Sequence, residues 1–172
     1  MNAQPEPAPA GDERRYLDRS RLARPELIGM VSGLVLIVSL WLPWFSTSSN
    51  PNSQIYSAHI GPNQTASAWD TFPTLRWLLL ALGLAPFILA WIVARGHKLT
   101  WRPGEVTMIV GMAGVVLVLG NGIIFGRPAP HVGISLDWGY WLGLLACVGI
   151  VVAGYQRQAT FGSGPKRPPG SV

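Results

Sequence analysis

The sequence predicts an all-α fold: an integral membrane four-helix bundle with both termini on the cytoplasmic side of the membrane. The first observation is composition, because 49% of the 172 residues are hydrophobic and only 12% are charged. Soluble domains carry about 25% charged residues. The second observation is that the apolar residues form four long runs, which the few remaining polar residues could not enclose in water. The third is the clustering of lysine and arginine near the ends of these runs.

The runs divide the chain into an arm, a membrane domain and a tail. Residues 1–24 begin with a Pro/Ala-rich stretch and predict a mostly disordered cytoplasmic arm. The membrane domain covers residues 25–156, and the tail, residues 157–172, is rich in glycine and proline and is predicted to be disordered. A helix of about 20 residues crosses a hydrocarbon core of ~30 Å. Runs of about this length predict spans over residues 26–45, 71–94, 106–125 and 138–155.

Orientation follows from the positive residues. Eleven of the 13 lysines and arginines fall on one side if the chain crosses four times, with five in the arm, three in the loop after the second span and three in the tail. The long loop over residues 46–70 has none. Because positive residues stay in the cytoplasm, we expect both termini to lie on the cytoplasmic side. The first run is expected to be an uncleaved anchor, since its exit, LPWFS, offers bulky rings where a signal peptidase needs small residues.

The first run ends in the octet SLWLPWFS, residues 39–46. Pro43 disfavours a helical conformation at Leu42 and therefore promotes the helix exit. Tryptophan and other aromatic rings prefer the headgroup level of a bilayer. We therefore interpret the rings near the outer plane as interfacial anchors: Trp41, Trp44, Phe45, Trp69, Trp138 and Trp141.

SLWLPWFS, followed after a polar loop by SAWDTF (residues 67–72), resembles a family of uncharacterised small four-span integral membrane proteins from actinobacteria. In that family an LPW-aromatic exit from the first helix precedes a [SG]-x-W-x-x-F entry to the second. The stretch over residues 126–154, with an Arg-Pro after the third span and a Gly-aromatic-Leu start to the fourth, is also similar to it. The resemblance covers most of residues 26–155. It implies an actinobacterial plasma membrane protein and no known activity.

Four charged residues near the outer plane form the main candidate site: Asp70, Arg76, Arg127 and Asp137. Asp70 and Asp137 precede helices and could cap their free N–H groups. Arg76 must reach outward or pair, because an unpaired charge in hydrocarbon costs ~2.5 kcal/mol or more. The alternatives are capping with an outward-reaching arginine, a structural ion-pair cluster, or an outer ionic cluster that binds a ligand.

Catalytic and metal chemistry find little support in the residues. His59 and His131 lie in outer loops without the compact spacing of a zinc site, so we expect no metal and no cofactor. No phosphate-binding loop, dinucleotide motif or nucleophile elbow occurs. Cys147, the single cysteine, allows no intrachain disulfide. Basic residues are not interleaved with aromatic ones, so no nucleic acid partner is predicted.

Small residues predict close helix contacts. Three small-xxx-small pairs place glycines on one helix face, which permits close approach of a second helix; they are Gly29 with Gly33, Gly122 with Gly126, and Gly139 with Gly143. We expect Asn121 to hydrogen-bond to a neighbouring helix and Pro86 to kink the second span. Packing within the bundle is one interpretation, and contact with a second copy or a partner helix is the other.

These features favour a non-enzymatic function: a small structural or accessory subunit, or a scaffold, of a membrane complex. The alternative is a component of a small-molecule or lipid transporter or channel, with a polar mouth on the outer face. A membrane enzyme comes third, because no acidic residue, lysine or histidine lies in the middle of a span. The expected partners are the lipid bilayer and either a second copy of the chain or another membrane protein.

Overall fold

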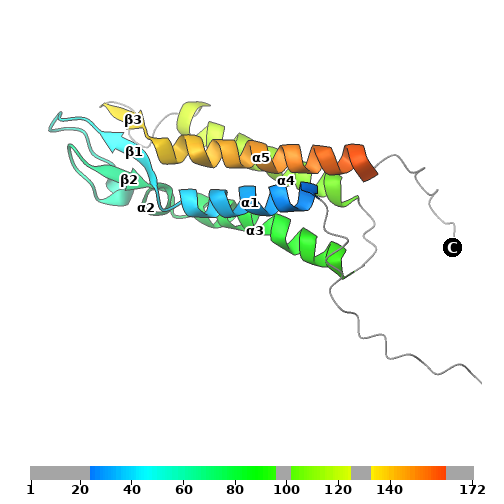
Figure 1. Cartoon of the computed structure of the whole chain (residues 1–172). Coiled ribbons are helices and arrows are strands. Elements are labelled where there is room, and N and C mark those ends of the chain that lie inside the picture. Colours follow the sequence, from blue (N-terminus) through cyan, green and yellow to red (C-terminus); the bar gives the residue numbers. More distant parts are fainter. Residues whose placement is uncertain (1–23, 96–101, 125–132, 162–172) are drawn as a thin grey trace, which may run out of the picture.

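The computed structural model describes residues 24–95, 102–124 and 133–161, which form a helical bundle with a small sheet at one end (Figure 1). Each of the helices α1 and α4 packs against both α3 and α5, and α5 makes the most extensive contacts. The predominantly helical fold agrees with the sequence prediction, whereas the sheet was not predicted. The long helices are α1 (Arg24–Ser39), α3 (Leu75–Ala94), α4 (Pro103–Leu119) and α5 (Trp138–Phe161).

Within the described residues, three helices are long and apolar enough to cross a membrane: Leu75–Ala94, Pro103–Ile124 and Trp138–Thr160. The second of them includes a π-helical segment, η3 (Gly120–Ile124), which continues α4. Helix α1 has 16 residues, which corresponds to ~24 Å. It lies beside α3 and α5 in the same bundle. The structure therefore contains three candidate spans and one shorter apolar helix.

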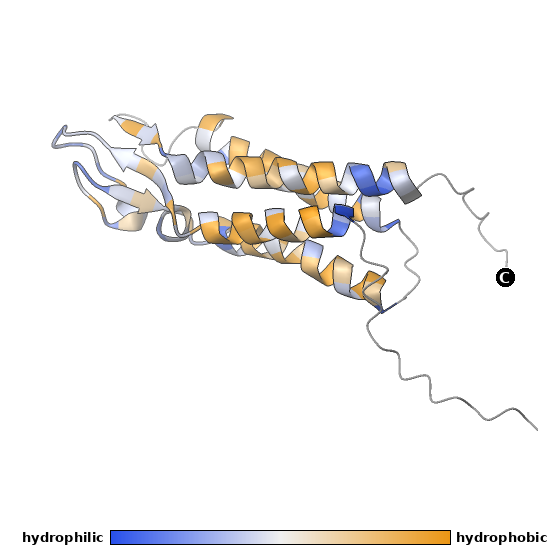
Figure 2. Ribbon diagram, in the orientation of Figure 1, coloured by the Kyte–Doolittle hydropathy of each residue, from blue (hydrophilic) through white to orange (hydrophobic). Residues whose placement is uncertain are grey.

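Hydrophobic residues predominate along all four long helices (Figure 2). Large hydrophobic residues are exposed on all four long helices; they include Leu27, Val31, Leu34, Leu78, Ile88, Met112, Val116, Leu145 and Val152. A soluble bundle would place polar residues on these faces. An apolar exterior on helices of this length suits hydrocarbon, and the model therefore supports location in a membrane.

The first helix ends six residues earlier than the predicted boundary at residue 45. Helix α1 stops at Ser39, and the next three N–H groups, of residues 40–42, bond back to the third carbonyl before each of them. Pro43 then starts the strand β1 (Pro43–Thr47). The prediction that the LPW segment marks the helix exit is confirmed, but the chain beyond it is a strand and not the end of a span.

Strand β1 is the centre of an antiparallel sheet with the order β2-β1-β3. Phe45 pairs with Ala66 of β2 (Thr65–Ser67) on one side and with Leu136 of β3 (Ile134–Leu136) on the other. The sheet thus joins the loop between α1 and α3 to the segment that precedes α5. Residues 43–67 and 134–136, which include the short 3-10 helix η2 (Tyr56–Ala58), are called the cap below.

The cap and the bundle share one hydrophobic core. Trp44, Phe45 and Ile55 of the cap are fully buried, and Tyr140 of α5 is 1% exposed. The Trp44 ring meets the Tyr140 ring edge-on at a centroid distance of 5.5 Å, and its Nε1–H donates to the Ser39 carbonyl oxygen at 2.7 Å. Trp44 and Phe45 thus differ from the expected interfacial anchors, because protein and not lipid surrounds their rings.

Small residues allow the helices α1 and α3 to cross at close range. A Cβ atom on Gly33 would overlap the Gly83 carbonyl oxygen, and one on Gly83 would lie 2.6 Å from Ile37 Cγ1. A Cβ atom on Gly29 would meet Ala153 and Pro86 at 3.5 and 3.6 Å, which is ordinary contact. Position 33 therefore accepts only glycine, whereas position 29 has room for a Cβ atom.

The other predicted packing residues serve different contacts. A Cβ atom on Gly122 would overlap the Tyr140 ring. Gly139 lies against Pro43 of the cap, and Gly143 lies against Trp44 of the cap. Gly126 lies outside the described residues. The expectation that Asn121 bonds to a neighbouring helix is wrong, because its Nδ2 donates to the Leu117 carbonyl oxygen of the preceding turn at 2.9 Å.

Candidate functional site

The acidic members of the predicted outer cluster form local hydrogen bonds. Asp70 lies in the short helix α2 (Ala68–Thr71), where its Oδ2 accepts a hydrogen bond from the Ser67 hydroxyl at 2.6 Å and its N–H donates to Ser67 Oγ at 3.2 Å. Asp137 Oδ1 accepts from the Trp138 N–H at 2.7 Å. Asp137 therefore caps an N–H group at the start of α5, as the capping alternative predicts. The capping prediction for Asp70 is wrong, because Ser67 caps α2 and Asp70 lies inside that helix.

Arg76 lies in the first turn of α3 and contacts aromatic rings. Its Nη1 donates to the Trp69 carbonyl oxygen at 3.0 Å, and its Cζ lies 5.1 Å from the Trp69 ring centroid and 5.6 Å from that of Trp77. Over the described ranges, Arg76 forms no ion pair with Asp70 or Asp137. Arg127, the fourth member of the predicted cluster, lies outside these ranges. Asp70, Asp137 and Arg76 therefore each make their own local contacts and form no ionic cluster with one another within the described residues.

Three tryptophans and Arg76 form a continuous group at the junction of cap and bundle, called the tryptophan–arginine cluster below. Trp41 stacks on Trp69 at a centroid distance of 4.9 Å, and Trp69 meets Trp77 at 5.2 Å. A backbone hydrogen bond from Trp69 N–H to the Leu40 carbonyl oxygen fixes α2 to the end of α1. Trp41 and Trp77 remain 53% and 55% exposed. The rings thus form a rigid, partly exposed frame around one cation.

Of the remaining predicted anchors, Trp138 and Trp141 are 54% and 48% exposed. Both lie in the first turn of α5, next to the cap. Their exposure is compatible with a place at the headgroup level, where the indole ring contacts lipid and its N–H reaches water. Their role as interfacial anchors stays a prediction.

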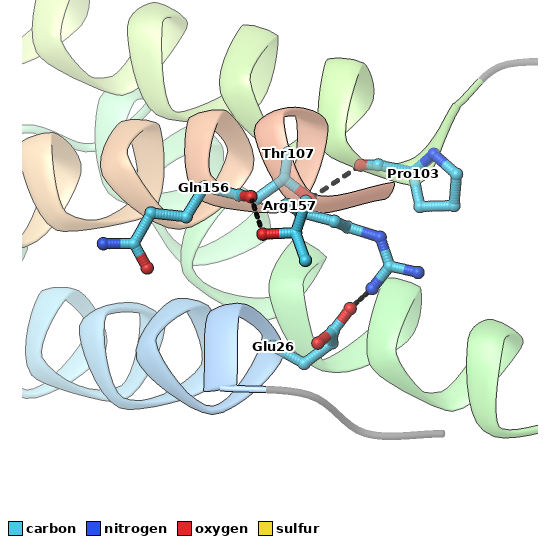
Figure 3. Close-up of polar contacts among 6 residues, drawn as sticks. Glu26, Pro103, Thr107, Gln156 and Arg157 are labelled. Carbon is cyan, nitrogen blue, oxygen red and sulfur yellow. Dashed lines mark hydrogen bonds and ion pairs between the residues drawn. The ribbon is translucent and has the colours of Figure 1, made fainter. Parts of the chain in front are cut away.

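The opposite end of the bundle contains an ion pair that the sequence analysis missed. Glu26, in the first turn of α1, pairs with Arg157 of α5, and Figure 3 shows the arginine side chain reaching from one helix to the other. Only 5% of the Glu26 side chain and 16% of the Arg157 side chain are exposed. Nearby, Gln158 Nε2 donates to Glu105 Oε1 of α4 at 3.2 Å. Polar contacts therefore connect α5 to both neighbouring helices at this end.

A cavity of about 20 Å³ lies beside this ion pair. All four long helices line it, through residues that include Pro25, Pro86, Thr107 and Ala153. The Thr107 hydroxyl donates to the Pro103 carbonyl oxygen of its own helix at 2.9 Å (Figure 3). A cavity of this size holds about one water molecule. It is too small for an organic substrate.

The described residues bring no metal-binding group together. Residues 24–95, 102–124 and 133–161 contain no cluster of three or more histidine, cysteine, aspartate or glutamate side chains that could hold a metal ion. His59 is exposed and adopts a left-handed backbone conformation with φ of 54° at the end of η2. His131 lies outside the described ranges.

The signal that could have identified the ion pair was the predicted topology. If both termini lie on one side, Glu26 at the start of the first span and Arg157 near the end of the fourth fall at the same membrane depth. Opposite charges at that depth lower their desolvation cost by pairing. The sequence analysis assigned Arg157 to the tail, because it ended the fourth helix at residue 155, whereas α5 continues to Phe161.

Comparison with protein families, with characterised proteins and with solved structures gives no match to this chain.

Proposed function

We propose that this chain is a four-span protein of the plasma membrane with both termini in the cytoplasm. Three candidate spans and an apolar exterior on all four long helices support a membrane location. Helix α1 becomes the fourth span because it lies in the same bundle and its backbone continues in a tight turn through residues 40–42. The lysine and arginine distribution supports an even number of crossings and places the cap outside.

Within this membrane location, we propose a non-enzymatic role as a small accessory subunit or scaffold. The observation that carries the proposal is the close packing of the described bundle: the cavity beside Glu26 and Arg157 holds about one water molecule, and the cap is part of the same core. A transporter or channel component would need an open polar mouth. Asp70 and Asp137, which would line such a mouth, are engaged in local hydrogen bonds with Ser67 and Trp138. These contacts favour the subunit over the carrier.

The cap offers the surface for a protein partner outside the membrane. From Ser48 to Thr65 the chain contains no aspartate, glutamate, lysine or arginine. Tyr56, in η2, is 79% exposed, which is the largest exposed fraction among the large hydrophobic residues of the described chain. Tyrosine combines a large apolar ring with a hydroxyl and is enriched at protein interfaces. An uncharged surface with one prominent tyrosine suits a partner recognised by shape and hydrogen bonds.

We also propose, from the resemblance of its motifs, that this chain belongs to the actinobacterial four-span family. The LPW exit supports it only in part, because any sequence with proline at this position would favour a helix end there. The family implies the same topology and plasma membrane location, and it supplies no activity.

The subunit role predicts that the full-length chain co-purifies with another membrane protein in fixed stoichiometry. Native membranes would be solubilised in mild detergent, and the tagged chain would be isolated and weighed by native mass spectrometry. We expect one defined complex, and we expect Tyr56→Ala to weaken it about tenfold, as loss of an interface aromatic does. Ser57→Ala, at the exposed neighbouring position, is the matched control and should leave the complex intact.

Recovery of the chain alone, together with solute transport by vesicles that contain only this chain, would contradict the subunit role and favour the carrier.

A further inference from the structure

Arg76 is the charge whose environment the proposed function leaves unexplained. Its guanidinium lies near the rings of Trp69 and Trp77, so their faces limit its rotation. Among the described residues only Nη1 makes a hydrogen bond, to the Trp69 carbonyl oxygen. Nε is buried and has no hydrogen-bond partner. The cation is thus held in one orientation with part of its hydrogen-bonding capacity unused.

No described carboxylate compensates this charge directly. Asp70, the acidic residue closest in sequence, accepts a hydrogen bond from Ser67, and Asp137 accepts one from the Trp138 backbone. Neither carboxylate pairs with Arg76 within the described ranges. A cation at the edge of the hydrocarbon layer is costly without a partner and attracts the phosphate groups of lipids.

The surrounding rings place this cation at the depth of lipid headgroups. Trp41 and Trp77 are each more than half exposed, and exposed tryptophans on a membrane helix concentrate at the interface between headgroups and acyl chains. The cluster also lies where the bundle meets the cap, because Trp69 follows β2 closely and Arg76 and Trp77 lie in the first turn of α3. A phospholipid bound here would place its acyl chains along α3 and its phosphate beside the Arg76 guanidinium.

We propose that the tryptophan–arginine cluster binds the phosphodiester group of one anionic phospholipid in the leaflet on the cap side. A guanidinium presents several N–H donors in one plane, which matches phosphate oxygens better than an ammonium does. The aromatic rings hold that plane fixed, so less rotamer freedom is lost when the lipid binds. An anionic lipid is preferred over a zwitterionic one, because its headgroup brings no second cation next to Arg76. The proposal rests on the membrane location and is independent of the subunit role.

The test is a lipid titration of the purified full-length chain, read by native mass spectrometry. Phosphatidylglycerol and phosphatidylcholine with identical acyl chains are added in equal amounts. We expect the unmodified chain to retain one phosphatidylglycerol in preference to phosphatidylcholine. Arg76→Gln should lower the phosphatidylglycerol affinity about fivefold, the effect of one basic residue at a membrane surface. Arg76→Lys should lower it about twofold, because the charge stays and the planar donor group is lost.

Arg95→Gln is the matched control. Arg95 directly follows α3 at the opposite end of the bundle, and its Cζ lies 4.2 Å from the centroid of the Trp91 ring. Its loss should leave the phosphatidylglycerol affinity unchanged, so that the twofold loss expected for Arg76→Lys stands apart from the control. Far-UV circular dichroism and gel filtration check that each variant is folded, and Arg76→Lys decides the test if Arg76→Gln does not fold.

Three results would overturn the lipid site. They are equal affinity for the two lipids, an unchanged phosphatidylglycerol affinity in the folded Arg76 variant, and an equal loss in Arg95→Gln. Displacement of the bound lipid by millimolar inorganic phosphate would also contradict it, since the site would then bind a free anion. Purification without any protein partner would contradict the subunit role and leave the lipid site standing.

Discussion

Replacing Arg157 by methionine is expected to lower the free energy of unfolding by about 3 kcal/mol, since a buried carboxylate loses its ion-pair partner. The Glu26 side chain is only 5% exposed, so water can replace little of that interaction. The pair also connects the first and last described helices, α1 and α5, which pack against each other. Denaturant titration of the purified chain in mild-detergent micelles measures the loss.

A double variant separates the ion pair from simple damage to α5. Glu26→Leu combined with Arg157→Met removes both charges, and we expect its stability to return to within about 1 kcal/mol of the original, because an apolar pair of similar volume avoids the desolvation cost. Gln156→Met, at an exposed neighbouring position on α5, should change stability by less than about 0.5 kcal/mol. A double variant as unstable as the single one would show that the pair itself does not stabilise the bundle.

Replacing Trp44 by alanine is expected to cost about 3–5 kcal/mol, which is the range for removing a large buried aromatic ring. Its side chain is fully buried between the cap and α5, and it fills the space against Tyr140 and Gly143. The substitution should also loosen the cap from the bundle. Unfolding in mild-detergent micelles would report the first effect, and faster proteolysis within residues 48–64 would report the second.

Two further variants divide the Trp44 contribution. Trp44→Phe keeps most of the ring but loses the hydrogen bond to the Ser39 carbonyl oxygen, and it should cost about 1 kcal/mol. Trp138→Ala removes a tryptophan that is 54% exposed at the same end of α5, and should change stability by less than about 0.5 kcal/mol. Equal losses from Trp44→Ala and Trp138→Ala would mean that Trp44 is an interfacial anchor after all.

The positions of the long helices could be predicted from the sequence because the cost of burying polar backbone in hydrocarbon demands continuous apolar helices. The predicted segment 71–94 ends at the last residue of α3, and the predicted start at residue 138 is that of α5. The predicted end of the first helix, at residue 45, was wrong because the apolar residues continue past Ser39 into the strand β1. In residues 40–45 the same leucines and rings that suit a lipid-facing helix also suit a buried cap.

The cap itself could not be predicted. Strands β2 and β3 have three residues each, which is too short for the alternation that identifies a strand. Their pairing with β1 joins residues 65–67 and 134–136, which are far apart in the chain. Such pairing depends on the tertiary arrangement of the helices, which brings these loops to the same end of the bundle.

The candidate sites divide in a similar way. The capping role of Asp137 followed from its place directly before a helix, a local signal, whereas Asp70 lies inside the short helix α2, which the sequence did not predict. The tryptophan–arginine cluster needed the approach of Trp41 to Trp69, and the ion pair needed the approach of Glu26 to Arg157, so both depend on packing between helices. Residue spacing in the sequence carries no record of either contact.

Cysteine labelling tests the central claim, that a bundle in the membrane separates an outer cap from an inner end. Tyr56→Cys places a thiol on the cap, and Arg95→Cys places one at the exposed opposite end of α3. The natural Cys147 is buried in the bundle and serves as an internal control that should stay unlabelled in the folded chain. A membrane-impermeant maleimide should label the Tyr56→Cys variant in intact cells and the Arg95→Cys variant only after permeabilisation. Labelling of both variants in intact cells, or of Arg95→Cys alone, would contradict the account.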